Sequence, residues 1–183
     1  TTPTKVAINN ENQNIFYVSS NGLNGLDKSS DGGLTWQKSN TGLPESGDVT
    51  IDPINQETLY CLTTFNGIYK STDSGNSWAQ LTDQPIYTYE INHSNSNIQY
   101  GANYNVFYKS DDGGATWKEI STINGGMMGD GSIVSIAYDP GNTDVLYCGT
   151  QLWWSADMFG GLYKSTDSGV TWTQLVTDQA AIR

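Results

Sequence analysis

Basic residues are scarce in this 183-residue sequence, which has 8 Lys and Arg against 19 Asp and Glu and a formal net charge of -11. So acidic a chain repels phosphate backbones, and we therefore exclude nucleic acid as a partner. Apolar runs are short, and none approaches the roughly 20 residues that a membrane-spanning helix needs. We expect no membrane span. The sequence begins without the basic and then apolar pattern of a signal peptide, which we interpret as a leader that was removed or never included.

Cysteine and histidine are also sparse. The two cysteines, Cys61 and Cys148, each follow a Leu-Tyr pair in matching places of two repeats. A whole repeat separates them, so we predict that both are small, buried and unpaired. The single histidine, His93, lies where other repeats have proline and is predicted to be a turn residue. One histidine without a cysteine cluster makes a poor metal site, and we expect neither a metal nor a cofactor.

What the sequence does have is a motif, Ser-x-Asp-x-Gly-x-(Thr/Ser)-Trp, which occurs four times without gaps. Its tryptophans are spaced 42, 39 and 55 residues apart. Short apolar runs with a period of about 40 to 50 residues indicate β-propeller blades, one four-stranded sheet per repeat. The conserved positions within the four repeats are Asp31, Asp73, Asp112, Asp167, Trp36, Trp78, Trp117 and Trp172.

Each repeat divides into strands in the same way. β-branched and aromatic residues cluster in runs between turn residues, and no helical stripe of useful length is present. We predict an all-β fold of four antiparallel blades, at residues 4–40, 48–82, 86–121 and 132–177. The predicted first strands are 4–8, 48–51, 86–91 and 132–138, the second strands 15–19, 58–63, 98–102 and 145–150, and the third strands 26–29, 67–71, 106–110 and 161–165. The fourth strand should begin at or just before each tryptophan.

The repeated motif has a physical role at the turn between the third and fourth strands. An aspartate such as Asp167 can accept hydrogen bonds from backbone N–H groups across a tight bend. Gly169 stands where the backbone φ should be positive, and Trp172 should cover the junction with apolar surface. We therefore assign the motif to the fold and not to a calcium site, because no loop has EF-hand ligand spacing.

The four motifs resemble Asp-box (BNR) repeats, which occur in the β-propellers of sialidases, xyloglucan-active glycoside hydrolases of the GH74 type, sortilin-type receptors and photosystem-assembly factors. The resemblance covers essentially the whole chain. It implies that the Asp-box turns are structural and lie on the face away from the binding site. Asp-box propellers usually have six or more blades, so three arrangements stay open: a small four-bladed ring, half of a larger ring completed by a second copy, or part of a longer protein. The last two are favoured, because an open blade face exposes apolar surface that needs a partner.

Two insertions in or next to the last repeat account for its longer spacing. Residues 152–160 contain Trp153, Trp154, Asp157 and Met158, and residues 122–131 lead into the same blade. We expect the two loops to be neighbours on one face, where adjacent tryptophans form a stacking platform for sugar rings. The alternative is that this aromatic loop plugs the ring or contacts a protein. The predicted ligand-binding residues are Trp153, Trp154, Asp157, Met158, Tyr104, Asn124 and Asp130.

Catalysis has weaker support. Sialidase chemistry requires an arginine cluster, and Arg183 is the only arginine. Glycoside hydrolysis needs two opposed carboxylates, for which Asp130 and Asp157 are weak candidates. The resemblance to xyloglucanases implies carboxylates on two separate propellers. We therefore predict a secreted or cell-surface binding module for a glycan or polysaccharide. The alternatives are a protein scaffold or self-assembling half-propeller, and a lobe of a glycoside hydrolase.

Overall fold

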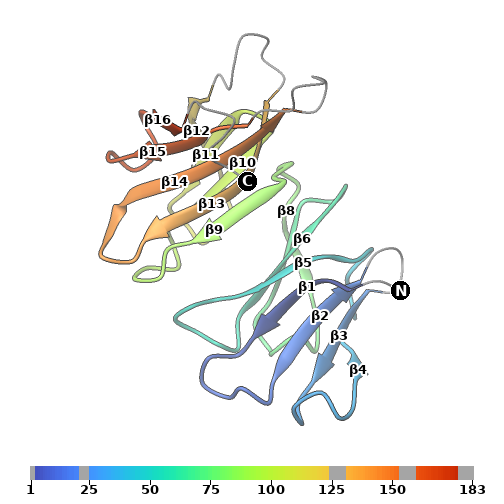
Figure 1. Ribbon diagram of the computed structural model, residues 1–183. Coiled ribbons are helices and arrows are strands. Elements are labelled where there is room, and N and C mark those ends of the chain that lie inside the picture. The colour runs from blue at the N-terminus through green and yellow to red at the C-terminus, as the bar shows by residue number, and fades with distance from the viewer. Residues whose placement is uncertain (1–2, 21–24, 124–130, 153–159, 177–183) are drawn as a thin grey trace. The chain divides into compact units, whose positions relative to one another are not determined.

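The structure is a computed structural model that describes residues 3–20, 25–123, 131–152 and 160–176. It contains four four-stranded antiparallel sheets, which confirms the prediction of an all-β protein with four propeller blades (Figure 1). The chain divides into two compact units, residues 1–85 with blades 1 and 2, and residues 86–183 with blades 3 and 4. Within the described ranges no helix is long and apolar enough to cross a membrane.

The first unit holds two sheets whose strands follow one another in chain order, β1-β2-β3-β4 and β5-β6-β7-β8. Blade 1 consists of β1 (Pro3–Ile8), β2 (Phe16–Ser20), β3 (Leu26–Ser29) and β4 (Gln37–Lys38). Blade 2 consists of β5 (Gly47–Ile51), β6 (Leu59–Thr63), β7 (Ile68–Ser71) and β8 (Ala79–Thr82).

The second unit repeats this order. Blade 3 consists of β9 (Thr88–Ile91), β10 (Gln99–Asn103), β11 (Val106–Ser110) and β12 (Lys118–Thr122). Blade 4 consists of β13 (Gly131–Asp139), β14 (Asn142–Leu152), β15 (Leu162–Ser165) and β16 (Thr173–Val176).

The observed strands overlap all of the predicted first, second and third strands. The predicted start of the fourth strand was wrong, because each begins at the residue after the tryptophan. In blade 2 the backbone just before this point has other partners. The N–H of Ser77 donates to Asp73, and the N–H of Trp78 donates to the carbonyl of Thr41. These donors are therefore not available to a ladder with β7.

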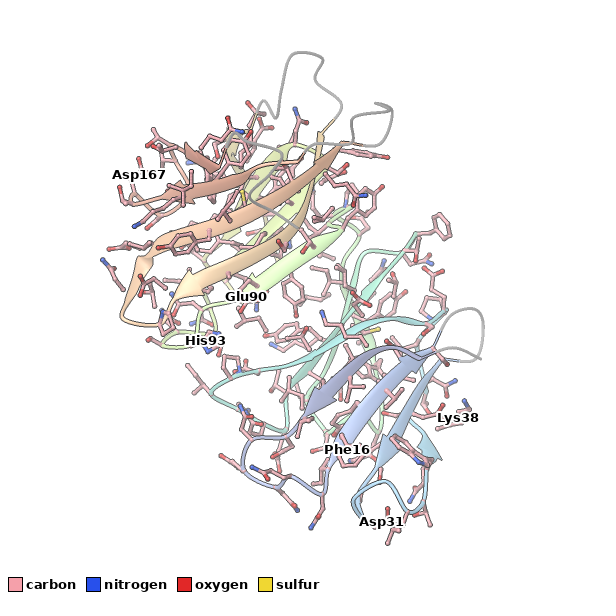
Figure 2. The ribbon with its side chains drawn as sticks, viewed as in Figure 1. Phe16, Asp31, Lys38, Glu90, His93 and Asp167 are labelled. Atoms are coloured by element: carbon pink, nitrogen blue, oxygen red, sulfur yellow. The ribbon has the colours of Figure 1, made fainter. Side chains whose placement is uncertain are left out.

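A single carboxylate organises each Asp-box turn. Asp73 Oδ1 accepts hydrogen bonds from Ser71 Oγ at 2.7 Å and from the Ser77 N–H at 2.9 Å, while Oδ2 accepts one from Ser77 Oγ at 2.6 Å. Ser71 Oγ in turn accepts a bond from the Gly75 N–H at 2.9 Å. The other three boxes repeat these bonds around their own aspartates, Asp31, Asp112 and Asp167. Asp31 and Asp167 lie at the turns that follow β3 and β15 (Figure 2).

The turn also needs two successive residues with left-handed backbone. Gly169 has φ +87°, as predicted, and Ser168 before it has φ +58°. Ser74 has the same conformation at φ +57° in blade 2, whereas blades 1 and 3 have glycine at this position. A residue with a side chain is strained in this backbone region. The turns of blades 2 and 4, which have serine at this position, are therefore slightly less favourable in free energy than the Gly-Gly turns of blades 1 and 3.

The tryptophan at the end of each motif makes a hydrogen bond through its indole Nε1. In three boxes its indole Nε1 donates to the carbonyl of the glycine three residues earlier, as in Trp117 to Gly114 at 2.9 Å. Trp78 differs, because its indole donates to the carbonyl of Ser39 in blade 1 at 2.8 Å. Trp78 is 6% exposed, whereas Trp36 is 44% exposed. The tryptophan of blade 2 is therefore part of the packing between blades 1 and 2.

The turn between the first and second strands has its own repeated chemistry. Asn9, Asp52, Asn92 and Asp139 each accept hydrogen bonds at Oδ1 from backbone N–H groups that follow in the turn. Such bonds replace the ladder partners lost where the chain reverses. His93 lies in this turn, as predicted, with Nε2 at 3.2 Å from Glu90 Oε1 (Figure 2).

Each unit has a hydrophobic core between its two blades. The core of the first unit includes Tyr17 and Leu26 from blade 1 packed with Leu59, Cys61 and Trp78 from blade 2. Burial, with a smaller effect of Asp73, raises the pKa of Tyr17 to about 12. The core of the second unit is built in the same way from Tyr100, Ala102, Phe107, Ile123, Ile133, Ile136, Tyr138, Leu146, Cys148 and Tyr163.

Both cysteines are free and buried, which confirms the prediction that they are unpaired. Burial raises the pKa of each thiol to about 12. Cys61 and Cys148 are therefore packing residues and not nucleophiles at neutral pH.

The Asp-box carboxylates should make the free energy of unfolding depend on pH in the acidic range. Hydrogen bonds from the hydroxyl and then the backbone N–H four residues later hold the pKa of Asp31, Asp73 and Asp112 at about 2. As the pH falls from about 4 to about 2, the unfolded chain binds protons that the folded chain does not, so stability is lost in this window. We predict that Asp73→Asn lowers the free energy of unfolding at neutral pH by about 1 kcal/mol and flattens this acid dependence, as measured by urea denaturation. The exposed Asp83→Asn variant is the control, and an equal flattening in it would contradict the prediction.

Candidate functional site

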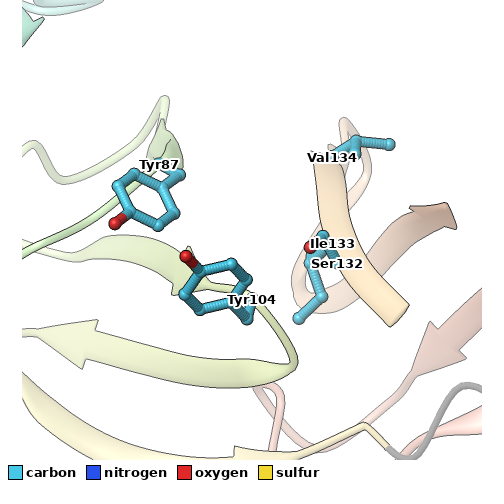
Figure 3. Close-up of a pocket in the computed structure, with 5 residues that line it drawn as sticks. All are labelled: Tyr87, Tyr104, Ser132, Ile133 and Val134. Carbon is cyan, nitrogen blue, oxygen red and sulfur yellow. The ribbon is translucent and has the colours of Figure 1, made fainter. Parts of the chain in front are cut away.

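A shallow pocket opens beside blades 3 and 4 within the second unit (Figure 3). It is lined by Tyr87, Tyr104, Ser132, Ile133 and Val134 and has a volume of about 280 Å³. This volume is near the lower end of the range for ligand sites, roughly 300 to 1,000 Å³. Of the predicted ligand-binding residues, Tyr104 is the one that the structure places here.

Tyr104 stands at the tip of the turn between β10 and β11. Its φ is +52°, and the residue is 60% exposed. The turn is held on both sides, because the Tyr104 carbonyl accepts from the Ile133 N–H and the Asn105 carbonyl accepts from the Ile123 N–H, both at 2.8 Å. A bulky side chain in left-handed backbone is strained, and glycine or asparagine would suit this turn better.

Tyr87 lies beside Tyr104 on the same side of the pocket (Figure 3). The two rings meet edge to face, with centroids 5.4 Å apart and planes at 83°. Partial burial and a hydrogen bond with the Tyr104 side chain raise the pKa of Tyr87 above its ordinary value. Tyr87 is still 47% exposed. The contact between the two rings therefore restricts their orientation, while both rings stay accessible to solvent.

The opposite wall comes from the start of β13. Ile133 is 3% exposed and anchors this strand in the core, while Val134 is 46% exposed. The pocket therefore combines two aromatic rings and aliphatic surface with the hydroxyls of Tyr87, Tyr104 and Ser132. This combination suits a ligand that has apolar faces and scattered hydroxyl groups.

The β13–β14 ladder extends toward the two inserted loops. Its last pair is Gly131 with Leu152, so the last residue of one insertion lies directly opposite the first residue of the other. The rest of both loops lies outside the described residues, and their expected proximity stays a prediction. Six predicted ligand-binding residues lie outside the described residues: Trp153, Trp154, Asp157, Met158, Asn124 and Asp130. Their roles stay predictions.

Sequence reasoning missed four lining residues, Tyr87, Ser132, Ile133 and Val134. A usable signal was present for two of them. The strand registers place Tyr87 and Val134 at the same position before the first turn, where blades 1 and 2 have Thr4 and Gly47. Two large side chains at this position distinguish the second unit from the first.

The five residues that line the described pocket supply aromatic, aliphatic and hydroxyl groups. None of its five lining residues is a carboxylate, histidine or cysteine. Among the described residues, no three histidine, cysteine, aspartate or glutamate side chains gather in a way that would hold a metal ion.

Four antiparallel blades, each with an Asp-box turn between its third and fourth strands, define a β-propeller of the Asp-box class. Residues 1–128 match the family described as the DUF6242 beta propeller domain, and the chain belongs to this family.

The chain is also similar in sequence to curated xyloglucanases. It is 25% identical over 214 residues to a xyloglucanase of Hypocrea jecorina (strain QM6a), with 93% of this chain and 25% of that protein covered. It thus spans about a quarter of the length of this curated relative.

Solved structures show the same fold. The GH74 xyloglucanase from Xanthomonas campestris superposes with a TM-score of 0.74 at 22% identity, covering 96% of this chain and 30% of that one. YCF48 from Cyanidioschyzon merolae gives a TM-score of 0.65 at 16% identity, covering 97% of this chain and 57% of that one. A YCF48 structure bound to D1 peptide matches with a TM-score of 0.54 at 14% identity, covering 92% of this chain and 65% of that one.

The strained and exposed Tyr104 should contribute little to folding. We predict that Tyr104→Gly changes the free energy of unfolding by less than about 1 kcal/mol, because relief of backbone strain offsets the lost ring contact. Tyr100→Ala, at a residue that is 2% exposed, should cost about 3 to 5 kcal/mol. Thermal and urea denaturation measure both. A loss for Tyr104→Gly as large as that for Tyr100→Ala would show that Tyr104 is a core residue.

Proposed function

We propose that this chain is a binding module for neutral glycan chains, with the pocket formed by Tyr87, Tyr104 and the start of β13 as part of its binding surface. The observation that carries this proposal is Tyr104. It is 60% exposed and has left-handed backbone at φ +52°. Folding alone favours neither property, and strained exposed residues cluster at functional sites.

The pocket chemistry favours a sugar ring over a charged ligand. The apolar face of a pyranose stacks on an aromatic ring, and its hydroxyl groups bond to polar neighbours. Tyr87 and Tyr104 supply the rings, and their hydroxyls with that of Ser132 supply hydrogen-bonding groups. The net charge of -11 disfavours anionic glycans, and the only arginine is Arg183.

The related proteins make β-glucan chains the first ligands to test. The curated relative and a similar solved structure are xyloglucanases, although the chain spans about a quarter of that curated relative. We propose binding and not hydrolysis, because the described lining has no carboxylate to serve as acid, base or nucleophile. A secreted or cell-surface location, as expected from the sequence, would bring the module to such a polymer.

We extend the proposed surface to Trp153 and Trp154. The described flanks of the two insertions are paired as Gly131 and Leu152, and Ser132 of the pocket follows Gly131 directly. An extended aromatic surface would bind several sugar residues in a row, beyond what a pocket of about 280 Å³ holds.

Calorimetric titration with xyloglucan oligosaccharides tests the proposal. We predict that Tyr104→Ala weakens binding by about tenfold, the upper value for loss of one aromatic contact. Tyr104→Phe should stay within about threefold of wild type, because it keeps the stacking ring.

Phe65→Ala is the matched control, since Phe65 is an exposed aromatic residue, at 85%, in the first unit. Its affinity should equal that of wild type. The proposal fails if wild type binds no neutral oligosaccharide, or if Tyr104→Ala and Phe65→Ala bind equally well.

A peptide is the second candidate ligand, favoured by the aliphatic wall of the pocket. Val134 is 46% exposed beside the tyrosine pair and would suit an apolar side chain. A YCF48 propeller of this fold has been solved with D1 peptide. Peptide binding that is lost in Val134→Asp, without any glycan binding by wild type, would favour this candidate.

A further inference from the structure

The two exposed tyrosines of this chain are neighbours. Of its 11 tyrosines, all of which lie within the described residues, Tyr87 and Tyr104 are the two that are exposed, at 47% and 60%. The others are buried or half-buried. The ring centroids of Tyr87 and Tyr104 are 5.4 Å apart. The chain therefore presents its most accessible phenols as one pair.

The geometry of this pair is set within blade 3. Tyr87 directly precedes β9, and its N–H donates to the Ala102 carbonyl at 2.8 Å, while Tyr104 follows the end of β10. The strands β9 and β10 are paired from Thr88 and Ala102 onward. The separation of the two rings is thus fixed by the pairing of two adjacent strands in one sheet.

The hydroxyl groups of the pair are close to each other. The Tyr87 and Tyr104 side chains share a hydrogen bond, and both hydroxyl oxygens lie toward the same side in the view of the pocket (Figure 3). When a phenol loses a hydrogen atom, the unpaired electron spreads to the ring carbons next to the hydroxyl carbon. These ortho carbons are therefore near each other in the pair. Both residues are exposed, so small rotations about their χ angles can bring the ortho carbons into contact.

A second tyrosine pair in the same unit provides a comparison. The rings of Tyr100 and Tyr138 have centroids 5.7 Å apart and planes at 61°, so ring separation does not distinguish the two pairs. Tyr100 and Tyr138 are 2% and 9% exposed and belong to the hydrophobic core, where close packing holds each ring in one orientation. The Tyr100 side chain forms its hydrogen bond with Ser168. Exposure and the shared hydrogen bond therefore set Tyr87 and Tyr104 apart.

We propose that Tyr87 and Tyr104 form an oxidative cross-linking site, at which a haem peroxidase with hydrogen peroxide joins the two rings as dityrosine. The site goes beyond the proposed glycan binding and does not depend on it.

The reaction needs no protein group other than the two phenols. Each tyrosine loses one electron and its hydroxyl proton and becomes a phenoxyl radical. The two radicals combine by forming a carbon–carbon bond between ortho carbons. The hydrogen on each joined carbon then moves to the ring oxygen and restores the phenol. Hydrogen peroxide takes up the two electrons and two protons and becomes two molecules of water, so the chain loses two hydrogen atoms.

Proximity favours coupling within the pair over coupling between chains. Each radical has its partner in the same blade, at an effective concentration that a dilute second chain does not reach. The yield per chain should therefore be independent of protein concentration. In urea the two rings are no longer held together, and the preference for this pair should be lost.

Peroxidase treatment of the native chain, followed by proteolysis and tandem mass spectrometry, tests the proposal. Cleavage after Glu90 places Tyr87 and Tyr104 on separate peptides, so a joined peptide pair that lacks two hydrogen atoms is diagnostic. Wild type should give this product together with dityrosine fluorescence. Tyr87→Phe and Tyr104→Phe should each lose both signals, because phenylalanine forms no phenoxyl radical.

Tyr100→Phe is the matched control, because it removes a hydroxyl from the buried pair. Its yield of dityrosine should equal that of wild type, and circular dichroism melts verify that each variant is folded. The proposal is overturned if native wild type forms no dityrosine, or if Tyr104→Phe keeps the wild-type yield. A cross-link between other tyrosines, or a yield that falls with dilution, would also overturn it.

The cross-link has a consequence for the pocket, and this consequence rests on the proposed function. Tyr87 and Tyr104 line the pocket, and joined rings can no longer turn independently onto a ligand. The cross-linked chain should therefore bind xyloglucan oligosaccharides more weakly than the untreated chain. Equal affinity would overturn this consequence. Absence of binding by the untreated chain would overturn the proposed function and this consequence together, while the mass spectrum still decides the cross-linking site.

Discussion

The Asp-box carboxylate is the interaction on which the rest of the structure depends. In each repeat it accepts a serine hydroxyl from the end of the third strand and a hydroxyl and N–H from the residue before the tryptophan, as around Asp73. These bonds replace the ladder partners that the backbone loses at the bend. They also fix the left-handed pair at Ser74 and Gly75. The direction in which the fourth strand leaves is thereby set.

The same turn has a second role between blades. The left-handed pair directs the carbonyls of Ser74 and Gly75 toward blade 1, where Tyr17, Lys28 and Ser39 donate to them. Polar groups exposed by the tight turn are thus satisfied by the neighbouring blade, and apolar burial around Trp78 accompanies these bonds.

Much of the fold could be predicted from the sequence, because the same short motif produces the same local hydrogen bonds in every repeat. The Asp-box residues, the positive φ of Gly169, the turn around His93 and the unpaired buried cysteines all follow from short-range patterns. The start of the fourth strand was missed, and in blade 2 the reason is that the Trp78 N–H bonds to Thr41, a partner far from it in sequence. Tyr87 and Val134 were missed because their role depends on which strand lies beside the turn at Tyr104.

By itself, then, the sequence determined the repeat, the strands and the turn chemistry, since these depend on hydrogen bonds and side-chain alternation within one blade. Only the tertiary structure decided which tyrosines are buried and which are exposed to solvent. Tyr17, Tyr100 and Tyr147 hold the same place in their blades, yet the first two are fully covered and the third is partly exposed. The physical reason is that burial of a blade face is decided by the neighbouring blade. Likewise, Tyr104 was a candidate binding residue from the sequence, but its positive φ and the contacts that hold its turn beside β13 appear only in the tertiary structure.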